Sequence, residues 1–414
     1  MLKIALTLVF TACFFDTVYA TSFSDEKHPV DVCFMVADLK YNTRQGVKIC
    51  EIQQASLSLF NGDKYRCEEE VSIHKELLNS LSQYNQQGWV VAGSIADRNL
   101  VSMLATSPMW RTPQDLGALF SDPSFKTLAK QPAKDIYDIS SYQGFLYISW
   151  AQLSAIPDFE KRLPGIVVMD KSSFSFWIDK YKMTKLFAED ELLSTIKPKW
   201  GNYRKIYTKE LASQIASDLG GETFVIKPRG EFLGNGVIIT QKQDLDDVLF
   251  YIINKKGKLA TVENPAYTMW KKDPFDSFIV EEFVASDPIT IPHLENKTYQ
   301  PTMRVAFLLV YNNHSHHVHF LGSYWKTPSL SINEEGDFME KNKDICQPPY
   351  YYAVDSKTMQ AVHKQLSATL PVLHRKMLEV SNSQEEYCTP IERKRVHFIL
   401  EKVHFPSCTP TTTK

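Results

Sequence analysis

The segment 38–53 reads DLKYNTRQGVKICEIQ, and its place near the start of the chain decides the fold that we expect. It joins two runs rich in β-forming residues, Val30–Ala37 and Gly46–Gln53, through a polar turn that contains Asn42. Such a strand, turn and strand form a β-hairpin. The end of the first strand then lies beside the second strand.

Three side chains of this hairpin are suited to a metal ion. Asp38 follows the first run, and Glu51 and Gln53 lie two positions apart on the second, so alternation puts Glu51 and Gln53 on one face. Carboxylate and amide oxygens are ligands that Mg²⁺ prefers. Asp38, Glu51 and Gln53 therefore offer oxygen atoms of the kind that a magnesium site uses. The alternative is a solvated hairpin with charged outward faces.

A second informative segment lies in the middle of the chain. Residues 224–240 read FVIKPRGEFLGNGVIIT, where an apolar strand ends in Lys227-Pro228 and a loop with Gly230, Gly234 and Gly236 leads to a second apolar strand. Glycines permit positive φ and a close approach of backbone N–H groups to phosphate oxygens, and the lysine adds a positive charge. The segment predicts a phosphate-binding hairpin, although its spacing is not that of a P-loop. A surface hairpin with an exposed lysine is the alternative.

Two flanking segments complete a pattern that resembles the ATP-grasp superfamily. Upstream, Asp179-Lys180 starts a helix-like run, and downstream the chain reads Val280-Glu281-Glu282-Phe283-Val284. The resemblance implies two α+β lobes that clasp ATP between them, with Lys180 and Lys227 at the phosphates. It implies that the segment from Glu281 to Val284 holds adenine, and that Asp287 binds the ribose hydroxyls.

In that superfamily an Asp and a Glu-x-Asn on neighbouring strands bind magnesium, usually after the strand that here contains Arg304. The region after Arg304 offers only Glu335, Glu340 and Asn342, in a loop-like context. The N-terminal hairpin supplies the missing pattern, with Gln53 in place of Asn. The chain is therefore similar to circularly permuted members such as the glutathionylspermidine synthetase-like proteins. The fold class that we predict is α+β or α/β: a circularly permuted ATP-grasp fold with an inserted α/β substrate-side domain.

The resemblance also divides the chain into parts. We expect a leader at 1–20, the metal-binding hairpin at 31–53, the substrate-side α/β domain at 54–175, the N-terminal lobe at 176–282, the C-terminal lobe with a closing helix at 283–381, and an extension with a disordered tail at 382–414. Strands are predicted at Gly88–Ala96, Phe145–Trp150, Gly165–Asp170, Ser277–Ala285, Thr302–Val310 and His316–Tyr324, and helices at Lys209–Leu219, Leu245–Ile253 and Thr358–Val380.

The implied chemistry uses ATP and Mg²⁺. The γ-phosphoryl group passes to a carboxylate, and an amine then attacks the acyl phosphate. Arg304 starts a strong strand, and its planar guanidinium suits phosphate or carboxylate. Lys326 is a second candidate cation, and for both residues the alternative is a charge at the edge of a strand. The implied function is an ATP-dependent carboxylate–amine ligase. The alternatives are a kinase that phosphorylates a hydroxyl or a protein, and a degenerate nucleotide-binding interaction protein.

The N-terminus and the overall charge bear on location and partners. Lys3, the apolar run Ile4–Phe15 and the small Ala20 predict a secretory signal and an exported protein, and an uncleaved membrane anchor is the alternative. No second apolar stretch of that length follows, so we expect no stable membrane span in the mature chain. The 46 Lys and Arg residues nearly balance the 48 Asp and Glu residues, which argues against a nucleic-acid partner.

The cysteines and a histidine cluster complete the candidates. Six cysteines follow Cys13, and an even number in an exported chain permits disulfides in about 15 pairings. Since no pair has the close spacing of a zinc site, we predict no structural metal. The four histidines of residues 314–319 are expected on an exposed hairpin, split between its two faces by alternation; they are His314, His316, His317 and His319.

Overall fold

The computed structural model describes residues 19–21, 27–55, 58–66, 72–95, 97–149, 152, 159–177, 179–231, 234–261 and 264–383. These residues form a mixed α+β structure with antiparallel and parallel sheets, so the coarse fold class is confirmed. Most of the predicted leader, the C-terminal extension and Cys67, Cys388 and Cys408 lie outside the described residues.

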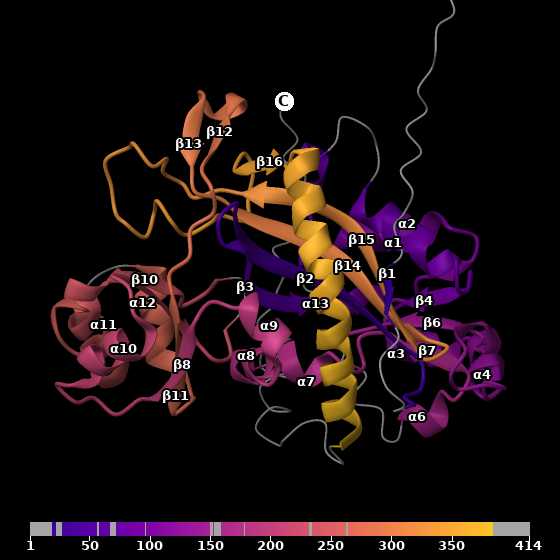
Figure 1. Cartoon of the computed structure of the whole chain (residues 1–414). Helices are drawn as coiled ribbons and strands as arrows, with labels where there is room; N and C mark the ends of the chain where they lie inside the picture. Colours follow the sequence, from indigo (N-terminus) through magenta and orange to yellow (C-terminus); the bar gives the residue numbers. More distant parts are fainter. Residues whose placement is uncertain are drawn as a thin grey trace, which may run out of the picture.

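An antiparallel sheet occupies the centre of the molecule (Figure 1). Its order is β1-β15-β14-β2-β3, and β16 pairs with β15. The N-terminal hairpin is β2 and β3, and β2 pairs along its length with β14 from the C-terminal half. The strands are β1 (Tyr19–Thr21), β2 (Asp31–Asn42), β3 (Gly46–Gln54), β14 (Thr302–Asn312), β15 (Ser315–Lys326) and β16 (Tyr351–Ala353).

Successive side chains of β2 point alternately into two different hydrophobic cores. Met35 and Leu39 pack in a cluster with the long helix α13 (Ser356–Ser383) and with α8 (Lys180–Ala188). Phe34 and Val36 point to the opposite face, where α1 (Ile73–Ser82) and α2 (Arg98–Thr106) cover the sheet. Because both faces are covered, nearly the whole strand is buried, including the charged Asp31, Asp38 and Lys40. Figure 1 shows α13 lying across the sheet.

Residues between β3 and α8 carry a small parallel sheet of order β5-β4-β6-β7. Its outer face packs against short helices through a third cluster that includes Trp89 and Phe125. The elements are β4 (Gly88–Val90), β5 (Trp110–Arg111), β6 (Gly144–Tyr147), β7 (Ile166–Val168), α3 (Leu116–Ser121), α4 (Pro123–Ala129), α6 (Phe159–Arg162) and α7 (Phe174–Trp177).

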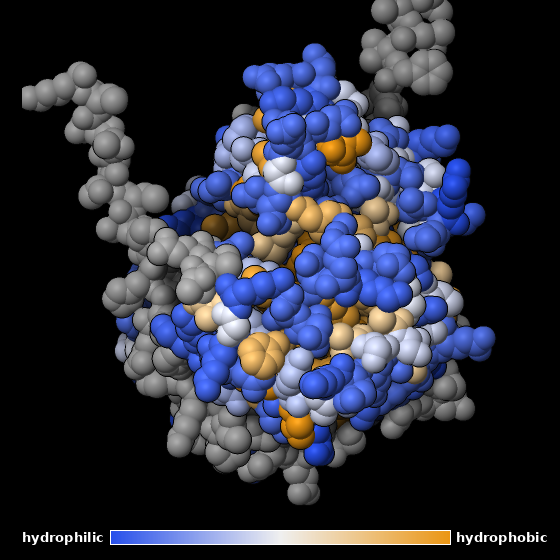
Figure 2. Space-filling model, turned by 90° about the vertical axis from the view of Figure 1, so that its left-hand side faces the viewer, coloured by the Kyte–Doolittle hydropathy of each residue, from blue (hydrophilic) through white to orange (hydrophobic). Residues whose placement is uncertain are grey.

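A second antiparallel sheet, of order β10-β9-β11-β8, forms a separate lobe on the left in Figure 1. Helices α10, α11 and α12 cover it through a fourth cluster around Phe224 and Trp270. Figure 2 shows the face of this lobe as largely hydrophilic, with hydrophobic side chains set back in a hollow. The elements of this lobe are β8 (Trp200–Arg204), β9 (Thr223–Pro228), β10 (Ile238–Gln241), β11 (Ser277–Glu282), α10 (Leu211–Leu219), α11 (Leu245–Asn254) and α12 (Pro265–Met269). Outside it, α9 (Glu191–Thr195) packs with α8 and α13, and β12 (Ile289–Ile291) and β13 (Lys297–Tyr299) form a small hairpin of their own.

Several sequence predictions are confirmed and one needs correction. The helix expected at Thr358–Val380 lies within α13, and Gly220 ends α10 with a φ of 71°. The exposed position expected for the histidine cluster is wrong for His316 and His319, because β15 pairs with a strand on each side and both side chains are buried. Of the cysteines that the sequence leaves open to pairing, Cys33, Cys50 and Cys346 are free thiols.

Among the described residues, no helix combines the length and the apolar character that crossing a bilayer requires.

Candidate active site

Three predicted site residues meet on one face of the central sheet. Arg304 on β14 lies directly opposite Asp38 on β2. Its Nε and Nη2 donate to the two carboxylate oxygens of Asp38 at 2.9 and 2.8 Å. Lys326, at the end of β15, donates to the same carboxylate at 2.9 Å and also pairs with Asp344 at 2.6 Å. The sheet register therefore builds a buried chain of alternating charges.

The electrostatics of this chain favour full ionisation. Burial alone raises the pKa of Asp38, but the charges of Arg304 and Lys326 outweigh burial and hold that pKa well below its ordinary value. Burial lowers the pKa of Lys326, but Asp344 and Asp38 outweigh burial and raise it well above the ordinary value. The Asp38 carboxylate is thus a permanent anion between two permanent cations.

Glu51 lies opposite Asp38 across the hairpin, and Lys180 forms an ion pair with it. Lys180 is the first residue of α8, and Asp179 caps that helix by accepting from the Tyr181 N–H at 2.9 Å. The backbone N–H of Lys180 donates to the Arg229 carbonyl at 2.9 Å, and the Arg229 guanidinium pairs with Asp179. Helix start and glycine loop are therefore tied together beside the hairpin.

Gln53 completes the predicted set. It lies opposite Val36 in the register and is buried, so it shares the face of Glu51 and Asp38. The structure thus puts on one face of the hairpin all three oxygen-bearing side chains that the sequence proposed as metal ligands. Whether they bind magnesium stays a prediction.

Lys227, Glu281 and Lys197 form a second buried cluster. Lys227 donates to one carboxylate oxygen of Glu281 at 2.5 Å, and Lys197 donates to the other at 2.6 Å. Burial lowers the pKa of Lys197, whereas for Lys227 the charge of Glu281 outweighs burial and raises the pKa. Burial raises the pKa of Glu281, but the two lysines outweigh it and lower that pKa.

A bulge in β3 connects this cluster to the hairpin. The pairing register shifts between Asp38 and Leu39, which leaves Cys50 as the extra residue of β3. The Cys50 carbonyl accepts from Lys227 at 2.9 Å and from Lys197 at 3.3 Å. The lysines of the separate lobe therefore reach the strand that carries Glu51.

A pocket lies beside the Cys50 bulge, between the separate lobe and the elements β3 and α8. Its charged lining comprises Glu51, Lys180, Lys197, Lys227 and Glu281. Apolar side chains complete the wall, including Ile52, Phe176, Met183, Phe187 and Ile279. The cavity measures only about 40 Å³, and the charged side chains of its lining are paired with one another. A larger ligand has to replace these pairs.

Positive charge exceeds negative charge across the whole site. Six cationic side chains face four carboxylates: Lys40, Lys180, Lys197, Lys227, Arg304 and Lys326 against Asp38, Glu51, Glu281 and Asp344. Such an excess in a buried site favours an anionic ligand.

The glycine loop borders the pocket. Lys227-Pro228 ends β9 as predicted, and Gly234 and Gly236 both have a φ of 71°, which a side chain tolerates poorly. Gly230 is buried at the start of the loop. Lys343, from the segment after β15, donates to the Val237 carbonyl at 3.4 Å and so connects this loop to the central sheet.

In the segment predicted to bind adenine, the side chains contact other residues of the protein. The Glu281 carboxylate is engaged by the two lysines, and Glu282 accepts from the Lys199 N–H at 2.9 Å. Phe283 packs near Phe338, and Val284 is buried. Asp287 accepts from the Thr43 N–H at 2.8 Å, so its carboxylate holds the β2–β3 turn. The roles at adenine and ribose stay predictions.

Sequence reasoning missed Lys197 and Asp344. Lys197 is followed by Pro198, which repeats the dipeptide Lys227-Pro228, and this repetition was the signal available. Asp344 lies in an irregular segment, and only the fold shows that this segment returns to Lys326.

No protein-family model matches the chain, and no curated protein matches it.

Proposed function

We propose that this chain is an ATP-dependent carboxylate–amine ligase of the ATP-grasp type, with a circularly permuted order of its elements. The observation that carries the proposal is the contact between Lys180 and Glu51, which joins the predicted phosphate site to the predicted metal hairpin. Four of the predicted site residues, from distant segments, line one pocket: Glu51, Lys180, Lys227 and Glu281.

The side chains fit magnesium. Asp38, Glu51 and Gln53 offer two carboxylates and one amide on one face of a hairpin, which are hard oxygen ligands. In the structure both carboxylates are paired with cations. Mg²⁺ bound there would neutralise phosphate charge and orient the transferred group. Lys180 and Arg304, which pair with these carboxylates in the structure, would then be able to face the phosphates.

The pocket also fits a nucleotide by its chemistry. The apolar wall around Ile52, Met183 and Phe187 suits a flat base, and the lysines beside it suit a polyphosphate. Phosphate oxygens would replace the Glu51 carboxylate on Lys180 and the Glu281 carboxylate on Lys227. Binding therefore exchanges one set of ion pairs for another, which limits the desolvation cost.

Arg304 and Lys326 then serve the acceptor. Both are buried and both point at Asp38, which is opposite Glu51 on the hairpin. Once a metal engages Asp38, the guanidinium and the ammonium can hold the acceptor carboxylate and the transferred phosphoryl group. Attack of the carboxylate on the γ-phosphorus releases ADP and forms an acyl phosphate. The amine then displaces phosphate and forms the amide.

The test is an assay of the full chain with γ-labelled ATP, Mg²⁺ and pooled carboxylates and amines. Label released as inorganic phosphate only when both acceptors are present supports the ligase. Lys227→Met should lower turnover about 100-fold or more, whereas Lys242→Met, on the exposed end of the same lobe, should leave it unchanged.

Two other outcomes identify the other functions. Label retained on a hydroxyl compound or on a protein would make the chain a kinase. ATP binding without turnover would favour a non-catalytic binding protein. Gln53 in place of Asn and the two cations on Asp38 are the observations that favour this last function.

A further inference from the structure

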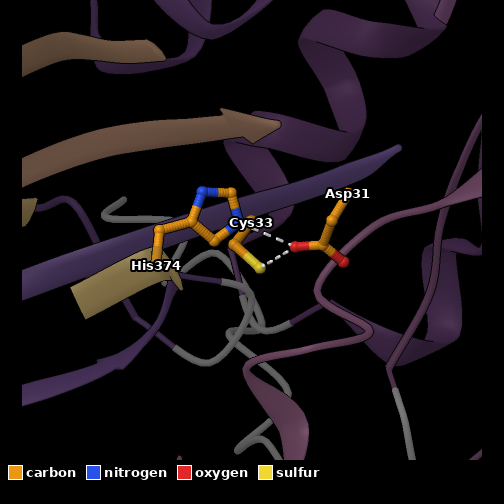
Figure 3. Close-up of side chains that lie close together, drawn as sticks. All are labelled: Asp31, Cys33 and His374. Atoms are coloured by element: carbon orange, nitrogen blue, oxygen red, sulfur yellow. Dashed lines mark hydrogen bonds and ion pairs between the residues drawn. The ribbon is translucent and has the colours of Figure 1, made fainter. Parts of the chain in front are cut away.

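A second polar cluster lies in the core, on the opposite face of β2 from Asp38. Asp31 and Cys33 lie two positions apart and therefore point to the same face of that strand, and His374 reaches them from α13. Cys33 and His374 have no exposed surface, and Asp31 is 3% exposed. Figure 3 shows the thiol and the imidazole converging on one oxygen of the Asp31 carboxylate.

The donor atoms are close enough to share one ion. Asp31 Oδ2 lies 3.1 Å from Cys33 Sγ and 2.9 Å from His374 Nε2, and the three atoms lie within 4.8 Å of one another. Tetrahedral zinc with bonds of 2.0 to 2.3 Å separates its ligand atoms by roughly 3.3 to 3.7 Å. The two contacts of Asp31 therefore lie within about half an ångström of such a ligand separation, and the Cys33 and His374 donor atoms lie no more than 4.8 Å apart.

A fourth potential donor atom lies beside these three. Ser172 Oγ, in the segment after β7, lies 2.6 Å from Asp31 Oδ2 and 3.2 Å from Cys33 Sγ. A sulfur, a nitrogen and two oxygens form a mixed set that suits a borderline ion such as Zn²⁺ better than Mg²⁺.

The second ring nitrogen of His374 also has a polar neighbour. Its other ring nitrogen, Nδ1, lies 3.3 Å from Nδ1 of the buried His316. A metal on Nε2 leaves the proton of His374 on Nδ1, and that proton then points at the His316 nitrogen. Such a partner fixes the tautomer and the ring orientation.

We propose that Asp31, Cys33 and His374, with Ser172, form a structural site for Zn²⁺ that is separate from the nucleotide pocket. Cys33 binds as the thiolate and releases its proton. The ion joins the first long strand to the last helix, across 343 positions of sequence between Asp31 and His374. This proposal replaces our expectation of no structural metal, which rested on cysteine spacing alone.

The test begins with the metal content of the unaltered full chain. The protein is unfolded with a chelator, refolded with or without ZnCl₂, and desalted. We expect about one zinc per chain and a rise in Tm of about 5 °C on refolding with zinc. Refolding with Co²⁺ should give a thiolate-to-cobalt absorption band in the near ultraviolet, and this measurement needs no variant.

Two variants locate the ion. Cys33→Ser keeps a hydroxyl donor toward Asp31 but removes the soft ligand, and it should lose the zinc. Cys346→Ser removes a free, exposed thiol elsewhere and should retain it. Zinc below about one tenth per chain with no cobalt–thiolate band overturns the proposal and leaves a hydrogen-bonded cluster that fastens α13. Equal zinc in Cys33→Ser and in the unaltered chain overturns it as well.

Discussion

Arg304 and Asp38 lie 266 positions apart in sequence and face each other on adjacent strands. Two hydrogen bonds join the guanidinium to the carboxylate, and both side chains are buried. Lys326 adds a second cation to the same carboxylate. Asp38 is therefore the common counter-ion of two cations, and the stability of this region depends more on Asp38 than on either partner.

The first prediction concerns the larger contribution of Asp38 to stability. Asp38→Leu leaves Arg304 without its buried partner and should lower the free energy of unfolding by about 3–5 kcal/mol. Arg304→Met leaves Lys326 on Asp38 and should cost less. Urea unfolding of both variants measures the difference, and equal losses would contradict the shared counter-ion.

A second prediction concerns the lysine that sequence reasoning missed. Lys197→Met removes one of the two cations on Glu281 and should weaken ATP binding about 10-fold or more, as expected for a charged hydrogen bond. Lys199→Met, two positions away and exposed, should leave the Kd unchanged. Titration calorimetry with ATP and Mg²⁺ compares them. Equal Kd values for the two variants would place the phosphates elsewhere.

A third prediction addresses Gln53. Asn has a shorter side chain than Gln and stands at this position in the resembling superfamily, so Gln53→Asn should lower the Mg²⁺ concentration that half-saturates ATP binding. Gln53→Leu removes the oxygen and should raise that concentration about 10-fold. Magnesium titrations at fixed ATP decide the point. An unchanged requirement in Gln53→Leu would remove Gln53 from the metal site.

A fourth prediction concerns pH. Burial, with a smaller effect from His317, lowers the pKa of His319 to about 4, and burial lowers that of His363 to about 4. Because the unfolded chain binds protons on these rings below about pH 6.5, stability should fall as pH drops from 6.5 toward 4. The loss should not exceed about 1.4 kcal/mol per pH unit for each ring.

His363 offers the matching variant. Its ring stacks on Phe320 with centroids 4.0 Å apart, so His363→Phe preserves an aromatic contact and removes the titration. Chemical unfolding at pH 7 and pH 5 should show a smaller loss for the variant than for the unaltered chain. A loss of the same size in both would show that His363 does not contribute.

The sequence by itself determined the elements and the local chemistry of the site. Turn residues around Asn42 and alternation on either side gave the β2–β3 hairpin, because these are local backbone preferences. Asp179 gave the start of α8 because an aspartate side chain caps the first turn of a helix. The sequence also showed that the strand β9 ends in Lys227-Pro228.

Only the tertiary structure decided which charges meet. Sheet register puts Asp38 opposite Arg304, and a bulge at Cys50 turns a carbonyl toward Lys227; neither is encoded in local propensity. Sequence reasoning missed Asp344 and the cluster of Asp31, Cys33 and His374 for the same reason. Their partners come from distant segments, and the contacts form only when burial of both faces of the central sheet fixes the strand order.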